Sequence, residues 1–140
     1  MNFLAHFHLA WPDEGLLVGA PEGDYYKGRL SGRLPPPIER GVALHRAIYA
    51  YTDTHEQIRE LRRQISPPLR RYAGILIDLS FDHYLCAHWS RFATVPQPEF
   101  NTTVYDSLEC HAELLSTDAR RMLARLREYD LLARYRDWQT

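Results

Sequence analysis

The sequence has few cysteines and no long apolar run. It contains two cysteines in 140 residues, Cys86 and Cys110, and they form no C-x-x-C pair, so the cysteine count does not indicate a zinc site. No stretch approaches the roughly 18 apolar residues that a membrane-spanning helix requires. The first residues lack the basic and apolar segments of a secretion signal. Because free thiols also fit a reducing compartment, we expect a cytoplasmic protein that does not enter a membrane.

The sequence also lacks a strong net charge. Its formal charge is −1, which argues against a general nucleic-acid binder. Arginines are nevertheless concentrated in two stretches, with five in residues 56–71 and six in residues 118–140. These stretches are interpreted either as solvated helix faces or as a docking surface for an acidic partner. The candidate docking residues in the first stretch are Arg62, Arg63, Arg70 and Arg71. A second group in the other stretch is Arg120, Arg121 and Arg125.

Alternating strand patterns are missing, and prolines divide the chain. Breaks fall at residues 34–37, 66–68 and 96–98. Helical spacing of apolar residues predicts helices over residues 38–63, 69–92 and 118–138. Residues 52–54 can divide the first of these by capping its second part, and Asp118 is the expected cap of the last. The helix over 69–92 is apolar on more than one side, so we expect it to be buried in the middle of the fold. The prediction is an all-α, compact single domain over residues 1–140.

Carboxylates and imidazoles are placed unusually on the central predicted helix. Asp78 and Asp82 are four residues apart and share one face, and His83 follows directly. Two carboxylates on a buried face repel each other unless a metal ion, an arginine or a histidine neutralises them. Two interpretations stay open, which are a metal or catalytic cluster and a structural network of salt bridges.

The remaining candidate residues have weaker individual signals. His6 and His8 would point apart in a helix but share a face in an extended segment. Asp24 lies in a turn region, and His45 lies on the next predicted helix among apolar neighbours, where a histidine is usually a core residue. Oxygen and imidazole ligands together suit manganese, iron, magnesium or zinc, and such a centre can activate water for phosphoester hydrolysis. No Walker-type loop, nucleophile elbow or glycine-rich dinucleotide loop is present.

Three segments stand out along the chain. They are residues 1–10 (MNFLAHFHLA), residues 44–48 (LHRAI) followed by Thr52 and Asp53, and residues 78–85 (DLSFDHYL) closing with His88 and Trp89. Together they resemble the acyl carrier protein phosphodiesterase family. Their order and spacing agree over residues 1 to about 90. Beyond that, residues 132–137 (LARYRD) are weakly similar.

The resemblance implies a fold, an activity and a partner. Members of this family are helical relatives of the HD-domain phosphohydrolases with a rearranged metal site. They cleave the phosphodiester that joins 4′-phosphopantetheine to a serine of acyl carrier protein, and manganese (Mn²⁺) is the usual metal. Acyl carrier proteins are acidic, which gives the arginine-rich stretches a candidate partner.

The resemblance also assigns roles to individual residues. It implies metal ligation by Asp24, His45, Asp82 and His83, and catalytic roles for His45, Asp78 and His83. His6 and His8 match the histidines at the family's N-terminus.

The sequence departs from the family pattern at identifiable positions. The family usually has asparagine where Ala20 stands and aspartate where Tyr49 stands, so two polar groups are missing near the implied site. We also expect the family's C-terminal helices to be lacking, because relatives usually continue beyond the position of Trp138. These departures favour an alternative, a non-catalytic module that binds the carrier protein. A third alternative is an HD-like phosphohydrolase acting on a nucleotide or a small phosphodiester.

Overall fold

A computed structural model of the chain describes residues 3–137, and within that range all regular structure is helical. This confirms the predicted all-α class. The α-helices are α1 (Phe3–Ala10), α2 (Glu14–Gly19), α3 (Glu22–Tyr25), α4 (Pro36–Thr54), α5 (Glu56–Gln64), α6 (Ala73–Ala87), α7 (Gln97–Cys110), α8 (Thr117–Glu128) and α9 (Leu131–Arg134). The 3₁₀ turns are η1 (Pro67–Tyr72), η2 (Trp89–Arg91) and η3 (Ala112–Leu114).

The predicted helix over residues 38–63 is two helices, α4 and α5. The sequence allowed for such a division. The break lies at His55, one residue after the Thr52–Thr54 segment, and the cap is a histidine. The ring nitrogen Nδ1 of His55 accepts a hydrogen bond from the backbone N–H of Gln57 at 3.3 Å. Its extended backbone ends α4, and its side chain satisfies a donor in the first turn of α5.

The predicted helix over residues 118–138 is likewise divided, into α8 and α9. The cap of α8 is Ser116, whose hydroxyl accepts from the N–H of Ala119 at 3.2 Å, and the expected cap Asp118 already lies inside the helix. Asp130 separates the two helices because its φ of 44° is left-handed, which a right-handed helix does not accommodate. Trp138, at the end of the predicted range, lies outside the described residues.

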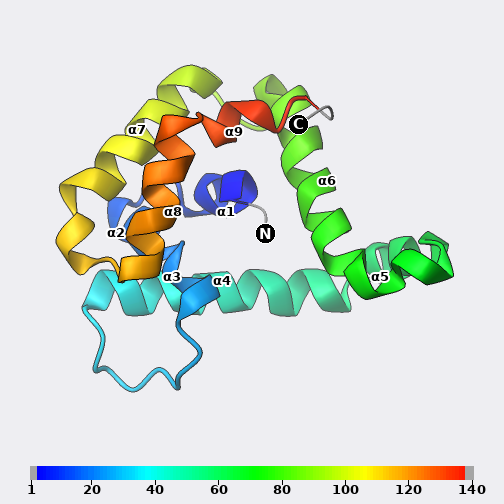
Figure 1. The fold of residues 1–140 in the computed structure, drawn as a ribbon, viewed down its shortest axis with the longest axis horizontal. Helices are drawn as coiled ribbons and strands as arrows, with labels where there is room; N and C mark the ends of the chain where they lie inside the picture. Colours follow the sequence, from blue (N-terminus) through cyan, green and yellow to red (C-terminus); the bar gives the residue numbers. More distant parts are fainter. Residues whose placement is uncertain (1–2, 138–140) are drawn as a thin grey trace.

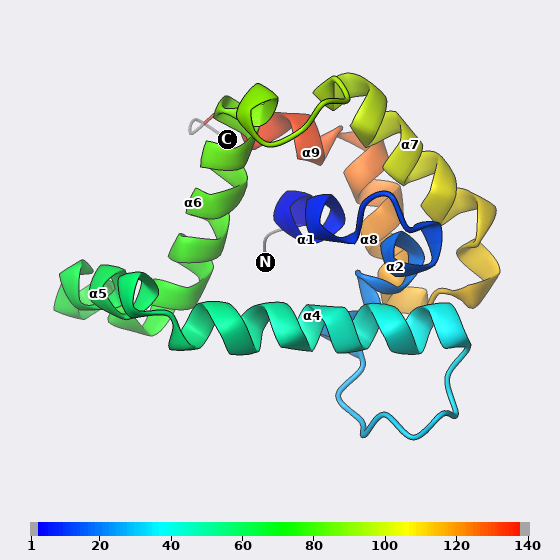
Figure 2. The same cartoon turned by 180° about the vertical axis from the view of Figure 1, so that it is seen from behind.

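The fold is organised around α1. Figures 1 and 2 show α1 in the middle and α4 along one side of it. Helix α6 lies near the C-terminal end of α4, and α7 and α8 lie across α1 from α6. Helix α1 contacts α2, α4 and α6 directly. Fully buried apolar side chains surround it and form the core, the largest being Leu4, Phe7, Leu17, Phe100, Leu108, Leu126 and Leu132.

The expectation that the central predicted helix is buried all round is wrong. In α6, Ile75 and Tyr84 are 55% and 59% exposed, and Leu76 and Leu79 are also on the surface. The most extensive contacts of α6 are with α1, η1 and α5, and these contacts leave its other apolar side chains on the surface. Within residues 3–137, no helix is both long enough and apolar enough to cross a bilayer.

Two glycines allow α2 and α4 to approach each other closely. Helices α2 and α4 share the most extensive interface, and Gly19 of α2 faces Gly41 of α4 across it. A Cβ atom at Gly41 would overlap the backbone of Gly19, and the reverse holds as well. The absence of side chains at both positions therefore sets the distance between the two helices.

We predict that Gly41→Ala destabilises the fold by about 1–3 kcal/mol, because the added methyl group meets backbone and no flexible side chain can yield. The midpoint of urea unfolding, followed by far-UV circular dichroism, measures this. Gly74→Ala is the matched control, because its Cβ would come no closer than 3.9 Å to another group. It should be neutral or slightly stabilising, and equal destabilisation by both substitutions would contradict the prediction.

Candidate functional site

Three polar side chains from three helices meet beside α1. The ring of His6 (α1) stacks on the ring of His45 (α4), with centroids 4.3 Å apart and planes 11° from parallel. Nε2 of His45 lies 3.6 Å from Oδ1 of Asp24 (α3). Both histidines are buried, and no described residue forms a hydrogen bond with either ring nitrogen of His6. We call His6, Asp24 and His45 the histidine cluster.

Local sequence explains why these side chains meet. Asp24 follows Gly23 in the single turn of α3, and a Cβ atom at Gly23 would overlap the ring of His45. The glycine thus lets the imidazole lie directly against the backbone of α3. Glu22 fixes the same turn from the other side, because its carboxylate accepts a hydrogen bond of 2.6 Å from the N–H of Ser116.

Burial controls the ionisation of the histidine cluster. It lowers the pKa of His6 to about 3, with the charge of His45 as a smaller cause, and lowers the pKa of His45 to about 4. Burial raises the pKa of Asp24 to about 6. At neutral pH the two imidazoles are therefore uncharged and the carboxylate is ionised. The His45–Asp24 contact is then polar and longer than a hydrogen bond.

Tyr49, which stood out in the sequence only as a departure from the family pattern, joins the histidine cluster to α6. Tyr49 lies one turn after His45, and its ring is 5.1 Å from the ring of His45 and 5.3 Å from that of His6. Its hydroxyl donates a 2.8 Å hydrogen bond to Oδ2 of Asp78. Burial raises the pKa values of Tyr49 and Asp78 alike. The i, i+4 spacing of His45 and Tyr49 is the sequence signal for this contact.

Asp82 has a different set of neighbours. Its carboxylate is fully buried and accepts hydrogen bonds from the N–H groups of Leu4 (3.0 Å) and Ala5 (2.9 Å) at the start of α1. Burial raises the pKa of Asp82 to about 7, and the two amides oppose that rise. The carboxylate thus acts as an N-terminal cap supplied by another helix.

The other two candidate histidines point elsewhere. Nδ1 of His83 lies 2.9 Å from the backbone oxygen of Tyr135, next to α9. His8 leaves α1 on another side from His6, and its ring lies 5.4 Å from that of Trp89. The helical form of α1 explains the separation, because residues two apart diverge by about 200°.

The candidate side chains do not form a complete set of metal ligands as they lie. Among residues 3–137, no three His, Cys, Asp or Glu side chains are arranged to hold one ion. Two features of the histidine cluster still suit a small ligand. The buried ring nitrogens of His6 have no hydrogen-bond partner within residues 3–137, and a cavity of about 10 Å³ adjoins all three residues of the cluster, roughly the space of one water molecule.

The candidate docking arginines lie on the surface and make local contacts. Arg62 pairs with Asp53 at 2.9 Å, and Arg63 pairs with Glu60 at 3.0 Å. Arg70 donates to the backbone oxygen of Ile65, and Arg71 stacks over the ring of Tyr72. Exposed pairs of this kind contribute little to stability and leave the guanidinium groups accessible.

The comparisons with known proteins agree with each other. A family model described as acyl carrier protein phosphodiesterase matches residues 1–140. A relative of that name from Yersinia pestis is 38% identical over 113 residues, which are 81% of this chain and 55% of the relative. A relative of the same name from Escherichia coli (strain K12 / DH10B) is 39% identical over 101 residues, which are 71% of this chain and 52% of the relative. The chain thus spans about half the length of these curated relatives. No solved structure matches it.

We predict that acid destabilises the chain through His6. Its pKa is 6.5 when unfolded and about 3 when folded, so stability is complete above pH 6.5 and falls as the pH drops below it. At pH 5 the loss from this residue is about 2 kcal/mol. His6→Gln, measured by urea unfolding at pH 8 and pH 5 with a chelator present, should lose less stability than the wild type by about that amount. The exposed His88→Gln is the control, and identical pH dependence for wild type and His6→Gln would refute the prediction.

Proposed function

This chain belongs to the acyl carrier protein phosphodiesterase family, and on that basis we propose that it hydrolyses the phosphodiester between 4′-phosphopantetheine and a serine of acyl carrier protein. The observation that carries the proposal is the buried histidine cluster. His6 and His45 lie in the first two segments of family resemblance, and Tyr49 links them to Asp78 in the third. Helices α1, α4 and α6 therefore bring the three segments to one place.

The proposed reaction needs a group that accepts a proton from water. The water oxygen attacks phosphorus, the bond from phosphorus to the serine oxygen breaks, and the serine oxygen gains a proton. At neutral pH, His45 is uncharged and Asp24 is ionised, so either can accept the proton of the attacking water. Burial raises the pKa of Asp78. Asp78 accepts the hydrogen bond from Tyr49 and so helps to hold Tyr49 beside His45. His83 contacts Tyr135, so its proposed catalytic role is the least supported of the three.

A non-catalytic module that binds carrier protein is the second candidate function. The observation that favours it is the hydrogen bond from Tyr49 to Asp78, because it engages a carboxylate that the resemblance assigns to catalysis. In that case the candidate docking arginines would hold the carrier protein, and the histidine cluster would be a structural element of the core.

The partner and its docking surface belong to the same proposal. An acidic carrier protein would approach Arg62, Arg63, Arg70 and Arg71, whose guanidinium groups can bind carboxylates in forked pairs. Attraction of this kind acts mainly on the association rate and weakens with salt. A cytoplasmic location, where the free thiols of Cys86 and Cys110 stay reduced, goes with it.

A divalent ion, with Mn²⁺ expected from the resemblance, is a further part of the proposal. When bound, it would stabilise charge on the phosphoryl group and lower the pKa of water. The reaction above is not routed through it, because the described side chains form no ligand set as they lie. The unpartnered nitrogens of His6 and the nearby Asp24 and His45 are the donors that support binding at the histidine cluster.

We predict that the purified chain releases the prosthetic group from holo-carrier protein, with Asp24→Asn and His45→Gln each lowering kcat by about 10²-fold or more. Mass spectrometry of the intact carrier protein measures the release. His88→Gln, an exposed histidine outside the cluster, should retain full activity. Stable association with no loss of the prosthetic group would favour the binding module and refute hydrolysis.

We predict that Mn²⁺ binding depends on Asp24 and not on His83. Isothermal titration of the chain with MnCl₂ should show binding that Asp24→Ala abolishes and His83→Ala preserves, because Asp24 adjoins His6 and His45 whereas His83 contacts Tyr135. Asp82→Ala should weaken binding indirectly, by releasing α1 and with it His6. Loss of binding in His83→Ala with retention in Asp24→Ala would place the ion elsewhere.

A further inference from the structure

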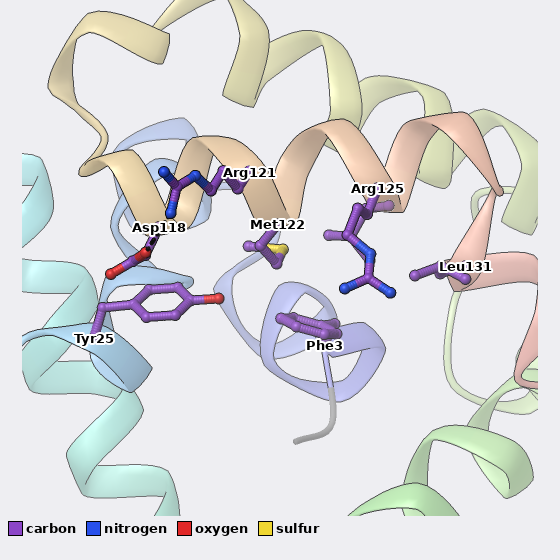
Figure 3. A pocket seen from close by; sticks show the side chains of 8 residues that line it. Phe3, Tyr25, Asp118, Arg121, Met122, Arg125 and Leu131 are labelled. Atoms are coloured by element: carbon purple, nitrogen blue, oxygen red, sulfur yellow. Dashed lines mark ion pairs between the residues drawn. The ribbon is translucent and has the colours of Figure 1, made fainter.

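A cavity of about 400 Å³ lies between α1, α3, α8 and α9. Ligand pockets commonly have volumes of about 300–1,000 Å³. Figure 3 shows its lining side chains, with Phe3 at the floor, Tyr25 at one end, Leu131 at the other and α8 above. It is distinct from the 10 Å³ cavity of the histidine cluster.

The two cavities are neighbours. Phe3 lines both of them, and Tyr25 directly follows Asp24 in α3. The Tyr25 hydroxyl points toward Phe3 in Figure 3. A ligand in the larger cavity is therefore separated from the histidine cluster by the side chain of Phe3 and by one turn of α3. The hydrogen bond that the carboxylate of Glu22 accepts from the N–H of Ser116 holds α3 against the start of α8 and so fixes this arrangement.

The lining combines an apolar wall with positive charge. Met122, Leu126, Phe3 and Leu131 supply the wall. Arg121 and Arg125 of α8, one turn apart, also line the cavity. In Figure 3, Arg125 extends from α8 toward Phe3, whereas Arg121 lies beside Asp118. Arg121 is paired with Asp118 at 3.6 Å, whereas no ion pair joins Arg125 to another described residue. Arg125 thus offers an uncompensated guanidinium group beside apolar surface.

An anion on a slender, uncharged chain matches this lining. A guanidinium group forms two parallel hydrogen bonds to a phosphate, and such bonds are stronger where apolar surface excludes water. The apolar wall would cover the chain, and the Tyr25 hydroxyl can bond to an amide. A free carboxylate on a bulky acidic helix would satisfy Arg125 but leave the wall uncovered.

We propose that this cavity binds an organic phosphate with a slender amide chain, and that Arg125 holds the phosphate. The inference rests on the proposed function, because 4′-phosphopantetheine, the product of that reaction, is a ligand of this class. It adds a residue on α8 that binds the released product, outside the segments that resemble the family most closely. Arg125 then binds a small molecule, and is not part of a surface for a protein partner.

Binding of 4′-phosphopantetheine to the full chain tests the proposal by isothermal titration calorimetry. Arg125→Gln should weaken binding by about tenfold or more, the usual effect of losing a charge-assisted hydrogen bond. Arg120→Gln, on the same helix but outside the cavity lining, is the matched control and should change affinity less than twofold. Leu131→Trp, which fills the cavity, should also abolish binding. Pantetheine, which lacks the phosphate, should bind wild type and Arg125→Gln equally weakly.

Three outcomes separate the inference from its premise. If Arg125→Gln binds 4′-phosphopantetheine as tightly as the wild type, the inference is overturned even if the chain is an active hydrolase. If Arg125→Gln weakens binding of apo-carrier protein but not of 4′-phosphopantetheine, Arg125 contacts the protein and the inference is again overturned. If binding depends on Arg125 but holo-carrier protein is never cleaved, the cavity assignment holds and the proposed hydrolysis fails.

Discussion

A buried carboxylate joins the two parts of the fold that carry the candidate site. Asp82 sits in α6 with no exposed surface, and both of its oxygens accept hydrogen bonds from the first amides of α1. Burying an ionised carboxylate costs free energy unless hydrogen-bond donors compensate it. The position of α1 is therefore strongly coupled to Asp82 of α6. Because α1 carries His6, the position of the His6 ring on His45 depends on this contact. Phe3, which divides the two cavities, depends on it as well.

Periodicity predicted part of the fold, and packing explains the rest. The all-α class and the regions of α4, α6 and α8 follow from apolar spacing and proline breaks. Helix α7 was not assigned, although Phe100, Val104 and Leu108 recur every four residues and are all buried. Its proline-rich start and its threonines concealed that pattern. The exposed side of α6 was not predictable, because an apolar residue in a helix does not reveal whether another element covers it.

The candidate site was likewise predictable from the sequence only in part. Sequence alone offered only weak individual signals for His6, Asp24 and His45, yet they form one buried polar cluster. It gave most weight to the Asp82–His83 pair, whose members turn to α1 and to Tyr135. Adjacent helical residues point about 100° apart, so adjacency in sequence is poor support for a shared ligand. The role of Tyr49 required the structure, because a hydrogen bond to Asp78 joins residues 29 positions apart.

The contact between Gly23 and His45 gives a way to sort related sequences. The imidazole occupies the space that any Cβ at position 23 would need, so the arrangement tolerates no side chain there. A relative with alanine or a larger residue at the equivalent position must hold its histidine in another place. In that relative, the histidine equivalent to His45 would no longer contact the aspartate equivalent to Asp24. A single backbone position, with no functional group of its own, is therefore a marker that distinguishes chains with the assembled cluster from chains that share only the fold.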